Sequence, residues 1–251
     1  MIRKTVLALM LAAAGVNAHA ALSAGDIAFT SFNADEDGLS FVTFKNIDAN
    51  TTIFFSDNEW GGSAFNTGES YNQWNSGSSQ IDAGSVIRFS AYDKTTLSAS
   101  TGTLSRVTVA SNTNWGISTT ADTIYAYLGS SATAPTTFLS AISNATDGSL
   151  VGTGLTEGTN AIRLNSIATG ATPDYAEYNG ARSGAASFDA YKAQVNNVAN
   201  WTIDTTNGSY ASTLPNTTAF SVTAVPEPKN YAMFLAGLGL MGLIARRKGK
   251  N

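Results

Sequence analysis

Residues 26–44 contain Asp26-Ile27-Ala28-Phe29-Thr30-Ser31-Phe32, then Asn33-Ala34-Asp35-Glu36-Asp37-Gly38, then Leu39-Ser40-Phe41-Val42-Thr43-Phe44. In the two outer segments apolar and polar side chains alternate, which is the pattern of a strand with one buried face. The polar segment between them ends in Gly and has the composition of a turn. Together the three segments predict an antiparallel β-hairpin.

Similar patterns continue through the body of the chain. Strands are predicted at residues 51–56, 85–90, 105–110, 123–128, 137–142 and 219–222, separated by clusters of Gly, Ser and Asn. Residues 188–195 have apolar side chains at helical spacing, and residues 61–80 and 143–173 are expected to form long loops. The prediction is therefore an all-β, immunoglobulin-like antiparallel sandwich with long loops, for which about 200 residues supply an adequate core.

The C-terminal stretch has three parts with different physical properties. Val225-Pro226-Glu227-Pro228 is followed by an apolar run over residues 231–245 and by a basic tail over 246–250 that contains Arg246, Arg247 and Lys248. A helix over 231–245 would be about 22 Å long, which spans the roughly 30 Å hydrocarbon layer only marginally. The basic tail favours the cytoplasmic side, so the body is expected on the outer side of the membrane.

This order of motif, apolar helix and basic cluster resembles the PEP-CTERM sorting signal of Gram-negative bacteria. The resemblance covers residues 225–251, about a tenth of the chain. It implies recognition and processing by exosortase, a membrane enzyme, followed by delivery to the surface or matrix. An ordinary C-terminal membrane anchor is the simpler alternative.

The N-terminal stretch predicts a signal peptide. Arg3 and Lys4 precede an apolar run over residues 5–16, and Ala18-His19-Ala20 supplies small residues for cleavage before Ala21. The expected organisation is a signal peptide over 1–20, an exported β-sandwich domain over 21–224 and a sorting signal over 225–251.

Removing both end segments shows an acidic body. Residues 21–224 contain 17 acidic and 7 basic side chains, a net charge of −10. A surface of this sign repels nucleic acid and attracts divalent cations, so no nucleic-acid partner is expected.

Two residue types are absent from the expected mature protein. The chain has no Cys, and its only histidine, His19, lies in the predicted signal peptide. Nucleophilic catalysis that depends on a Ser-His or Cys-His pair and the usual zinc sites are therefore excluded. An enzyme built on this body would have to use carboxylates, Lys, Tyr or a hard cation.

A second resemblance covers most of residues 24–222. It rests on Gly25-Asp26-Ile27-Ala28-Phe29, on Thr52-Ile53-Phe54-Phe55-Ser56-Asp57-Asn58-Glu59-Trp60, and on Asp122-Thr123-Ile124-Tyr125-Ala126-Tyr127. These segments are similar to exported bacterial domains akin to the lamin-tail β-sandwich. The resemblance implies a fold that hosts binding and adhesion more often than catalysis, although fold alone does not assign function.

The acidic turn is a candidate calcium site. Asn33, Asp35 and Asp37 offer oxygen ligands at alternate positions, and Gly38 stands sixth, as in the first half of a calcium loop. The twelfth position is Phe44, where a bidentate Glu is required, so the segment is not an EF-hand. A loop that borrows a ligand from elsewhere and a solvated acidic turn both remain open.

A second candidate site combines carboxylates with aromatic rings. Asp57, Glu59 and Glu69 flank Trp60, Tyr71 and Trp74, a composition used by sugar-binding clefts and by glycosidases. We predict glycan contacts for Asp57, Glu59, Trp60 and Trp74. The alternative is a strand-end turn in which Trp60 packs on the core.

These patterns predict an exported, non-enzymatic surface or extracellular-matrix protein involved in adhesion, matrix structure or polysaccharide contact. A carboxylate-based glycan-active enzyme and a calcium-stabilised binding module are the alternatives. Expected partners are an exosortase-type protease, the export machinery and extracellular polysaccharide. The precursor is expected transiently in the inner membrane, with no organic cofactor and calcium as the candidate ion.

Overall fold

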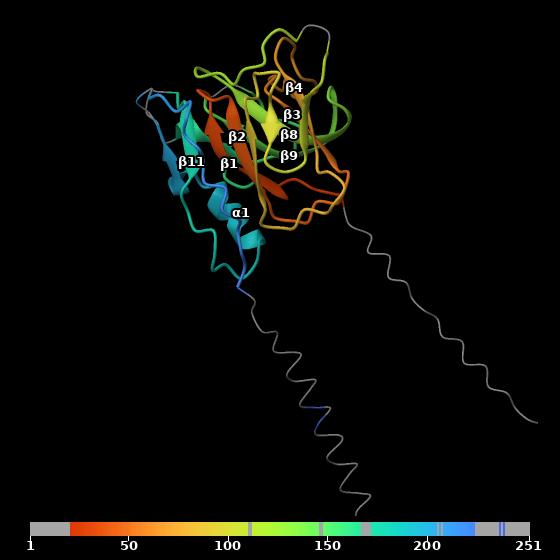
Figure 1. The fold of residues 1–251 in the computed structure, drawn as a ribbon, viewed down its shortest axis with the longest axis vertical. Helices are drawn as coiled ribbons and strands as arrows, with labels where there is room; N and C mark the ends of the chain where they lie inside the picture. Colours follow the sequence, from red (N-terminus) through yellow and green to blue (C-terminus); the bar gives the residue numbers. More distant parts are fainter. Residues whose placement is uncertain are drawn as a thin grey trace, which may run out of the picture.

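The structure is a computed structural model that describes residues 21–109, 112–145, 148–166, 172–204, 206, 208–223, 236 and 238. The described body is a β-sandwich of two six-stranded sheets (Figure 1). All neighbouring strands pair antiparallel except the β9–β10 pair, which is parallel.

The predicted hairpin forms the centre of the first sheet. Within it Phe29 lies opposite Phe41, and the pairing register shifts at a bulge between Phe29 and Ser31. The sheet contains, in spatial order, β12 (Trp201–Ile203), β11 (Tyr175–Tyr178), β1 (Ile27–Asn33), β2 (Gly38–Thr43), β5 (Val86–Ser90) and β6 (Ser98–Ala99).

The second sheet is organised around β8 and β9, which form a long hairpin closed by a tight turn. In spatial order it contains β10 (Ala161–Arg163), β9 (Ala134–Ser143), β8 (Thr123–Ser131), β3 (Thr52–Ser56), β4 (Tyr71–Asn75) and β7 (Thr103–Arg106). Two short 3₁₀ helices, η1 (Leu164–Ser166) and η2 (Val198–Asn200), and the helix α1 (Asp189–Val195) complete the described elements.

Aromatic rings fill the space between the sheets. Phe41 contacts Phe55, Phe89 and Trp74, with ring centroids 5.5–5.6 Å apart, and Phe55 lies 4.9 Å from Phe89. All four side chains are fully buried. Edge-to-face contacts of this kind add to the free energy gained by burying the rings.

The second sheet is apolar on its outer face as well. Phe54, Tyr125, Tyr127 and Phe138 form a separate buried cluster on that face, together with Trp60. Loop residues cover these rings: Phe65 packs against several of them, and the Trp60 indole donates a hydrogen bond to the carbonyl of Val151. The two loops therefore close a second hydrophobic layer.

The structure confirms most of the predicted elements and corrects four regions. Residues 219–222 form only an isolated bridge at Val222, and the strand predicted at 105–110 lies at Thr103–Arg106. The predicted loop 61–80 contains β4, and the predicted loop 143–173 contains β10 and η1. The helix predicted at 188–195 is confirmed as α1.

No helix within the described part of the chain is long and apolar enough to cross a membrane. The transmembrane helix predicted at 231–245 lies outside the described residues apart from Ala236 and Leu238.

Truncating the central ring should destabilise the sandwich strongly. Phe55→Ala removes contacts with Phe29, Phe41 and Phe89 and leaves a cavity between the sheets, so we expect a loss of about 3–5 kcal/mol in the free energy of unfolding. Val151→Ala, at a side chain that is 73% exposed, is the control and should be nearly neutral. Denaturant titration checks both values; a Phe55→Ala loss below about 1 kcal/mol would contradict this packing.

Candidate functional site at the acidic end

The strand register gathers acidic residues at one end of the sandwich. The ladders align the end of β1 with the starts of β2 and β11, the end of β3 with the starts of β4 and β8, and the start of β8 with the end of β9. We call this end the acidic end. Its loops carry Asp35, Glu36, Asp37, Asp57, Glu59, Glu69, Asp93, Asp122, Asp174 and Asp204.

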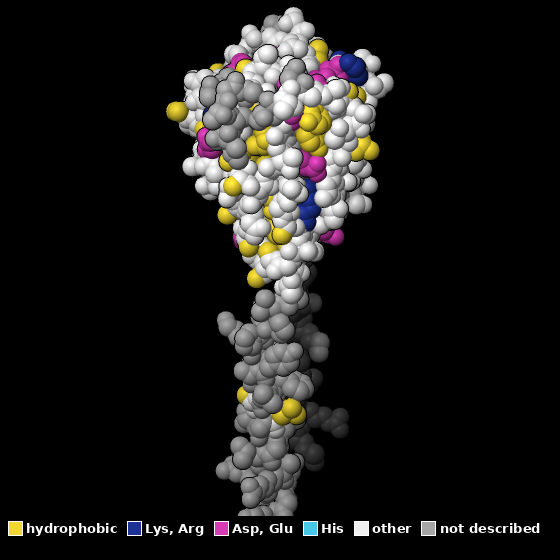
Figure 2. Space-filling view, turned by 90° about the vertical axis from the view of Figure 1, so that its left-hand side faces the viewer, with side chains coloured by type: hydrophobic (Ala, Val, Ile, Leu, Met, Phe, Trp, Pro, Cys, Tyr) yellow, Lys and Arg dark blue, Asp and Glu magenta, His cyan; other side chains and the backbone are white. Residues whose placement is uncertain are grey.

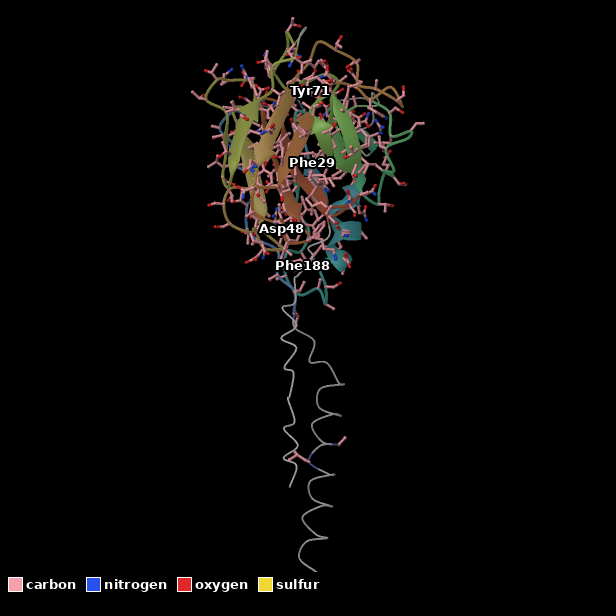
Figure 3. The ribbon with its side chains drawn as sticks, turned by 90° about the vertical axis from the view of Figure 1, so that its right-hand side faces the viewer. Phe29, Asp48, Tyr71 and Phe188 are labelled. Atoms are coloured by element: carbon pink, nitrogen blue, oxygen red, sulfur yellow. The ribbon has the colours of Figure 1, made fainter. Side chains whose placement is uncertain are left out.

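The described chain enters and leaves at the opposite end, which we call the exit end. Ala21 lines a groove there with Phe44 and Phe188. The last described segment is held nearby, because Phe220 donates its N–H to the carbonyl of Gly84 and Thr223 donates to Ala185. Figure 3 shows Tyr71 toward the acidic end and Phe188 toward the exit end.

Charged groups elsewhere on the body are sparse. On the face drawn in Figure 2 most of the described surface is uncharged, and the basic side chains lie in small groups beside acidic ones. Several charged groups of the described residues form ion pairs: Arg88 pairs with Glu36, and Lys192 pairs with Asp26 and Asp189.

The predicted calcium ligands are engaged by backbone donors. The Asn33 Oδ1 atom accepts from the N–H groups of Asp35 and Glu36 at 3.1 Å. Asp35 accepts from the N–H of Tyr210 at 2.6 Å, and Asp37 accepts from that of Ile117 at 2.5 Å. The two carboxylates thus anchor two different distant segments.

In this geometry the candidate calcium ligands Asn33, Asp35 and Asp37 act as hydrogen-bond acceptors within the protein. Among the residues that the structure describes, no group of three or more His, Cys, Asp or Glu side chains is placed to hold a metal ion. The alternation of Asn33, Asp35 and Asp37 is explained by a turn closed by its own Asn and by two anchoring hydrogen bonds. Burial raises the pKa of Asp37 to about 6, and the neighbouring Asp93 contributes to the rise.

Asp57 is a buried carboxylate in the second candidate site. It follows β3 and is fully buried. Its Oδ1 atom accepts two hydrogen bonds from Ser70, from the N–H and from the hydroxyl, each 2.7 Å long. Burial raises the pKa of Asp57 to about 7, opposed by the Ser70 donors and reinforced by the charge of Glu69.

Asn58 completes the base of this loop. Its amide donates to the carbonyl of Ser70 at 3.0 Å, and its Oδ1 atom accepts from the N–H of Glu69 at 3.1 Å. Asp57 and Asn58 therefore fasten the two ends of the loop that covers the outer aromatic cluster. Their first role in the structure is to hold this loop closed.

The predicted glycan-contact residues do not form an open cleft. Trp74 is fully buried between the sheets and donates its indole N–H to the carbonyl of Thr101 at 2.7 Å, so its expected role as an exposed sugar platform is wrong. Trp60 is 7% exposed and packs in the outer cluster, as the structural alternative expected. Asp57 is buried as well, which leaves only Glu59 accessible to a large ligand.

Three buried polar residues near Asp57 were missed by sequence reasoning. Asn72 lies opposite Phe55 in the ladder and faces the interior with Trp74, Tyr92 follows β5, and Asp122 precedes β8. In Tyr71-Asn72-Gln73-Trp74, Asn72 and Trp74 are two residues apart and so share one face of a strand. This spacing was the sequence signal that Asn72 faces the interior. No sequence pattern places Tyr92 or Asp122 near Asp57, because their proximity follows from the pairing of distant strands.

Replacing Asp57 with Asn should flatten the pH dependence of stability. Because the folded-state pKa of Asp57 lies above its ordinary value, the folded state holds the extra proton, and stability falls as pH rises from about 4 to about 7. The loss is at most about 4 kcal/mol by linkage. Asp57→Asn keeps an acceptor for Ser70 and removes the charge, so it should melt at or above the wild type at pH 8.

The measurement is the melting temperature of the full-length chain in mild detergent and chelator, from pH 5 to pH 8. Asp82→Asn is the matched control, since Asp82 is exposed at the exit end. Parallel pH profiles for wild type and Asp57→Asn would show that Asp57 carries no such penalty.

Comparison with known proteins identifies the tail and nothing in the body. Residues 224–248 match the family described as the PEP-CTERM protein-sorting motif. No curated protein and no solved structure matches the chain. The chain carries a PEP-CTERM sorting motif directly after its described β-sandwich body.

Proposed function

We propose that this protein is an exported, non-enzymatic β-sandwich that exosortase releases to the cell surface or extracellular matrix, where it contributes to adhesion, matrix structure or polysaccharide contact. The observation that carries the proposal is the sorting motif at residues 224–248, which implies export and sorting by exosortase. A signal peptide over residues 1–20, cleaved before Ala21, starts this route.

The position of the motif supports a defined orientation during processing. The docked segment ends at Thr223, and residues 224–230 separate it from the proposed membrane helix over 231–245. The eight Cα–Cα steps from residue 223 to residue 231 span at most about 29 Å when fully extended. In our proposal the exit end therefore faces the membrane closely, and the acidic end points away from it.

The proposal of a binding rather than catalytic role rests on the residues available. The described body has neither His nor Cys. Asp57 is buried, and Trp60 and Trp74 pack in hydrophobic clusters, so they support structure and not a sugar cleft. We propose an immunoglobulin-like, lamin-tail-like sandwich that presents its loops to partners.

The sorting proposal is tested by Glu227→Ala. Removing this carboxylate from Val225-Pro226-Glu227-Pro228 should leave full-length precursor in the inner membrane, because the enzyme loses the charged residue of its motif. Lys229→Ala, just outside the four-residue motif, is the control. Fractionation and immunoblotting in the native host measure where the protein accumulates. Identical fractionation of Glu227→Ala and wild type would contradict the proposal.

The non-enzymatic proposal is tested on polysaccharide substrates. The full-length chain in mild detergent should release no reducing ends above those of a heat-denatured sample, since Asp57, Trp60 and Trp74 are buried and cannot line an open sugar cleft. Release of sugar that Glu59→Gln abolishes would replace this proposal with a carboxylate-based enzyme.

A further inference from the structure

A small polar cavity lies beside β11, near the edge of the first sheet that ends in β12 (Figure 1). Its volume is about 160 Å³, below the roughly 300–1,000 Å³ of pockets for drug-sized ligands, so it suits a single small polar molecule. We call this cavity the β11 pocket. Its lining includes Tyr175, Glu177, Asn179, Arg182, Thr202 and Asn216.

The carboxylate of Glu177 is held in a fixed position on the wall of the β11 pocket. Glu177 and Thr202 are cross-strand neighbours in the β11–β12 ladder, so their side chains lie on the same face of the sheet. Oε1 of Glu177 accepts the N–H of Asn216 at 2.6 Å, and Oε2 accepts the Tyr175 hydroxyl at 2.6 Å. A carboxylate has about four acceptor sites, so Glu177 keeps capacity for further donors.

Arg182 brings a buried positive charge to the same pocket. The residue is only 9% exposed, and its guanidinium carbon lies 4.9 Å from the ring centre of Phe220. The guanidinium donates to the carbonyls of Thr218 at 3.1 Å and Tyr178 at 3.4 Å, which uses two of its five N–H donors. Among the described residues it forms no ion pair. Buried charges are usually paired, so this guanidinium is suited to a further oxygen ligand.

Two further lining residues are not needed for the attachment of the last described segment. Glu177 and Arg182 hold that segment through Asn216 and Thr218, which gives these two contacts a structural role. The side chains of Asn179 and Thr202 are exposed and form no hydrogen bond with the described residues, although both line the pocket. Their polar groups are therefore available to a ligand.

The charge balance of the β11 pocket favours a neutral ligand. Glu177 and Arg182 contribute opposite charges, and the other lining residues named above are uncharged. Residues 21–224 carry a net charge of −10, which disfavours the approach of an anion. Sugar hydroxyl groups both donate and accept, so neighbouring hydroxyls can serve the carboxylate acceptor and the guanidinium donor in one cavity.

We propose that the β11 pocket binds one neutral sugar residue of an extracellular polysaccharide. Fixed donors and acceptors that converge on a small cavity orient a polar ligand without a further cost of ordering the protein. The inference rests on the polysaccharide contact in the proposed function and gives that contact a place on the body. With a single sugar residue in contact, the Kd should be on the order of 1 mM.

Affinity electrophoresis of the full-length chain in mild detergent tests the site. Gels that contain dextran, mannan, galactan or xylan supply neutral polysaccharides, and a gel with polygalacturonate supplies an acidic one. At least one neutral polysaccharide should retard the protein relative to a gel without polysaccharide, and polygalacturonate should not.

Variants at the two exposed lining residues locate the binding. Thr202→Lys places a longer side chain in the pocket and an ammonium beside Glu177, so it should weaken the retardation at least tenfold. Asn179→Ala removes one hydrogen-bonding group and should weaken it about two- to tenfold. Thr103→Lys is the matched control, because Thr103 is an exposed residue on β7, the edge strand of the second sheet. All three variants should keep the wild-type Tm; if Thr202→Lys alone lowers it, Asn179→Ala decides.

The outcomes separate failure of the site from failure of the proposed function. Retardation by a neutral polysaccharide that Thr202→Lys and Asn179→Ala leave unchanged, or that Thr103→Lys weakens equally, overturns the β11 pocket and leaves polysaccharide contact standing. No retardation by any of the four neutral polysaccharides overturns both the site and the polysaccharide contact. Retardation by polygalacturonate alone overturns the assignment to a neutral sugar.

Discussion

The packing of aromatic rings between the two sheets is the interaction on which the rest of the structure depends. Phe41 of the first sheet lies against Phe55 and Trp74 of the second, and Phe89 completes the group. The chain has no Cys, so no disulfide fixes the sheets to each other. Their mutual position therefore rests on hydrophobic burial and on ring geometry. The strand ends, and hence the acidic loops, are placed by this packing.

A second constraint follows from the apolar outer face of the second sheet. Phe54, Tyr127 and Phe138 would be exposed if the loops did not cover them. Trp60 and Phe65 provide that cover, and Asp57 and Asn58 fasten the base of the covering loop. Carboxylates beside aromatic residues thus reflect the closure of a hydrophobic layer here, although the same residue types line sugar clefts in other proteins.

The sequence predicted what depends on local pattern. Alternation located β1, β2, β3, β5, β8 and β9, and the helical spacing of Phe188, Tyr191 and Val195 located α1. The sequence pattern missed β4, because the buried face of Tyr71-Asn72-Gln73-Trp74 carries a polar residue, Asn72, beside Trp74. It missed β10, because Ala161–Arg163 is only three residues long. At the candidate site it named Asp57 but not Asn72 or Tyr92, since their proximity arises from pairing between distant strands. It also placed Trp74 on the surface, because sequence spacing alone does not tell which face of a strand is covered.

The body is polarised: the described chain enters and leaves at the exit end, and carboxylates gather at the other end. In our proposal, processing at the sorting motif frees this body while the docked segment that ends at Thr223 is retained. Intact-mass and terminal-peptide mass spectrometry of the mature protein from its native host measures both ends of the processed chain. We predict an N-terminus at Ala21 and a C-terminus between residues 224 and 230. A mature chain that still ends at Asn251, or one cut upstream of Phe220, would contradict it.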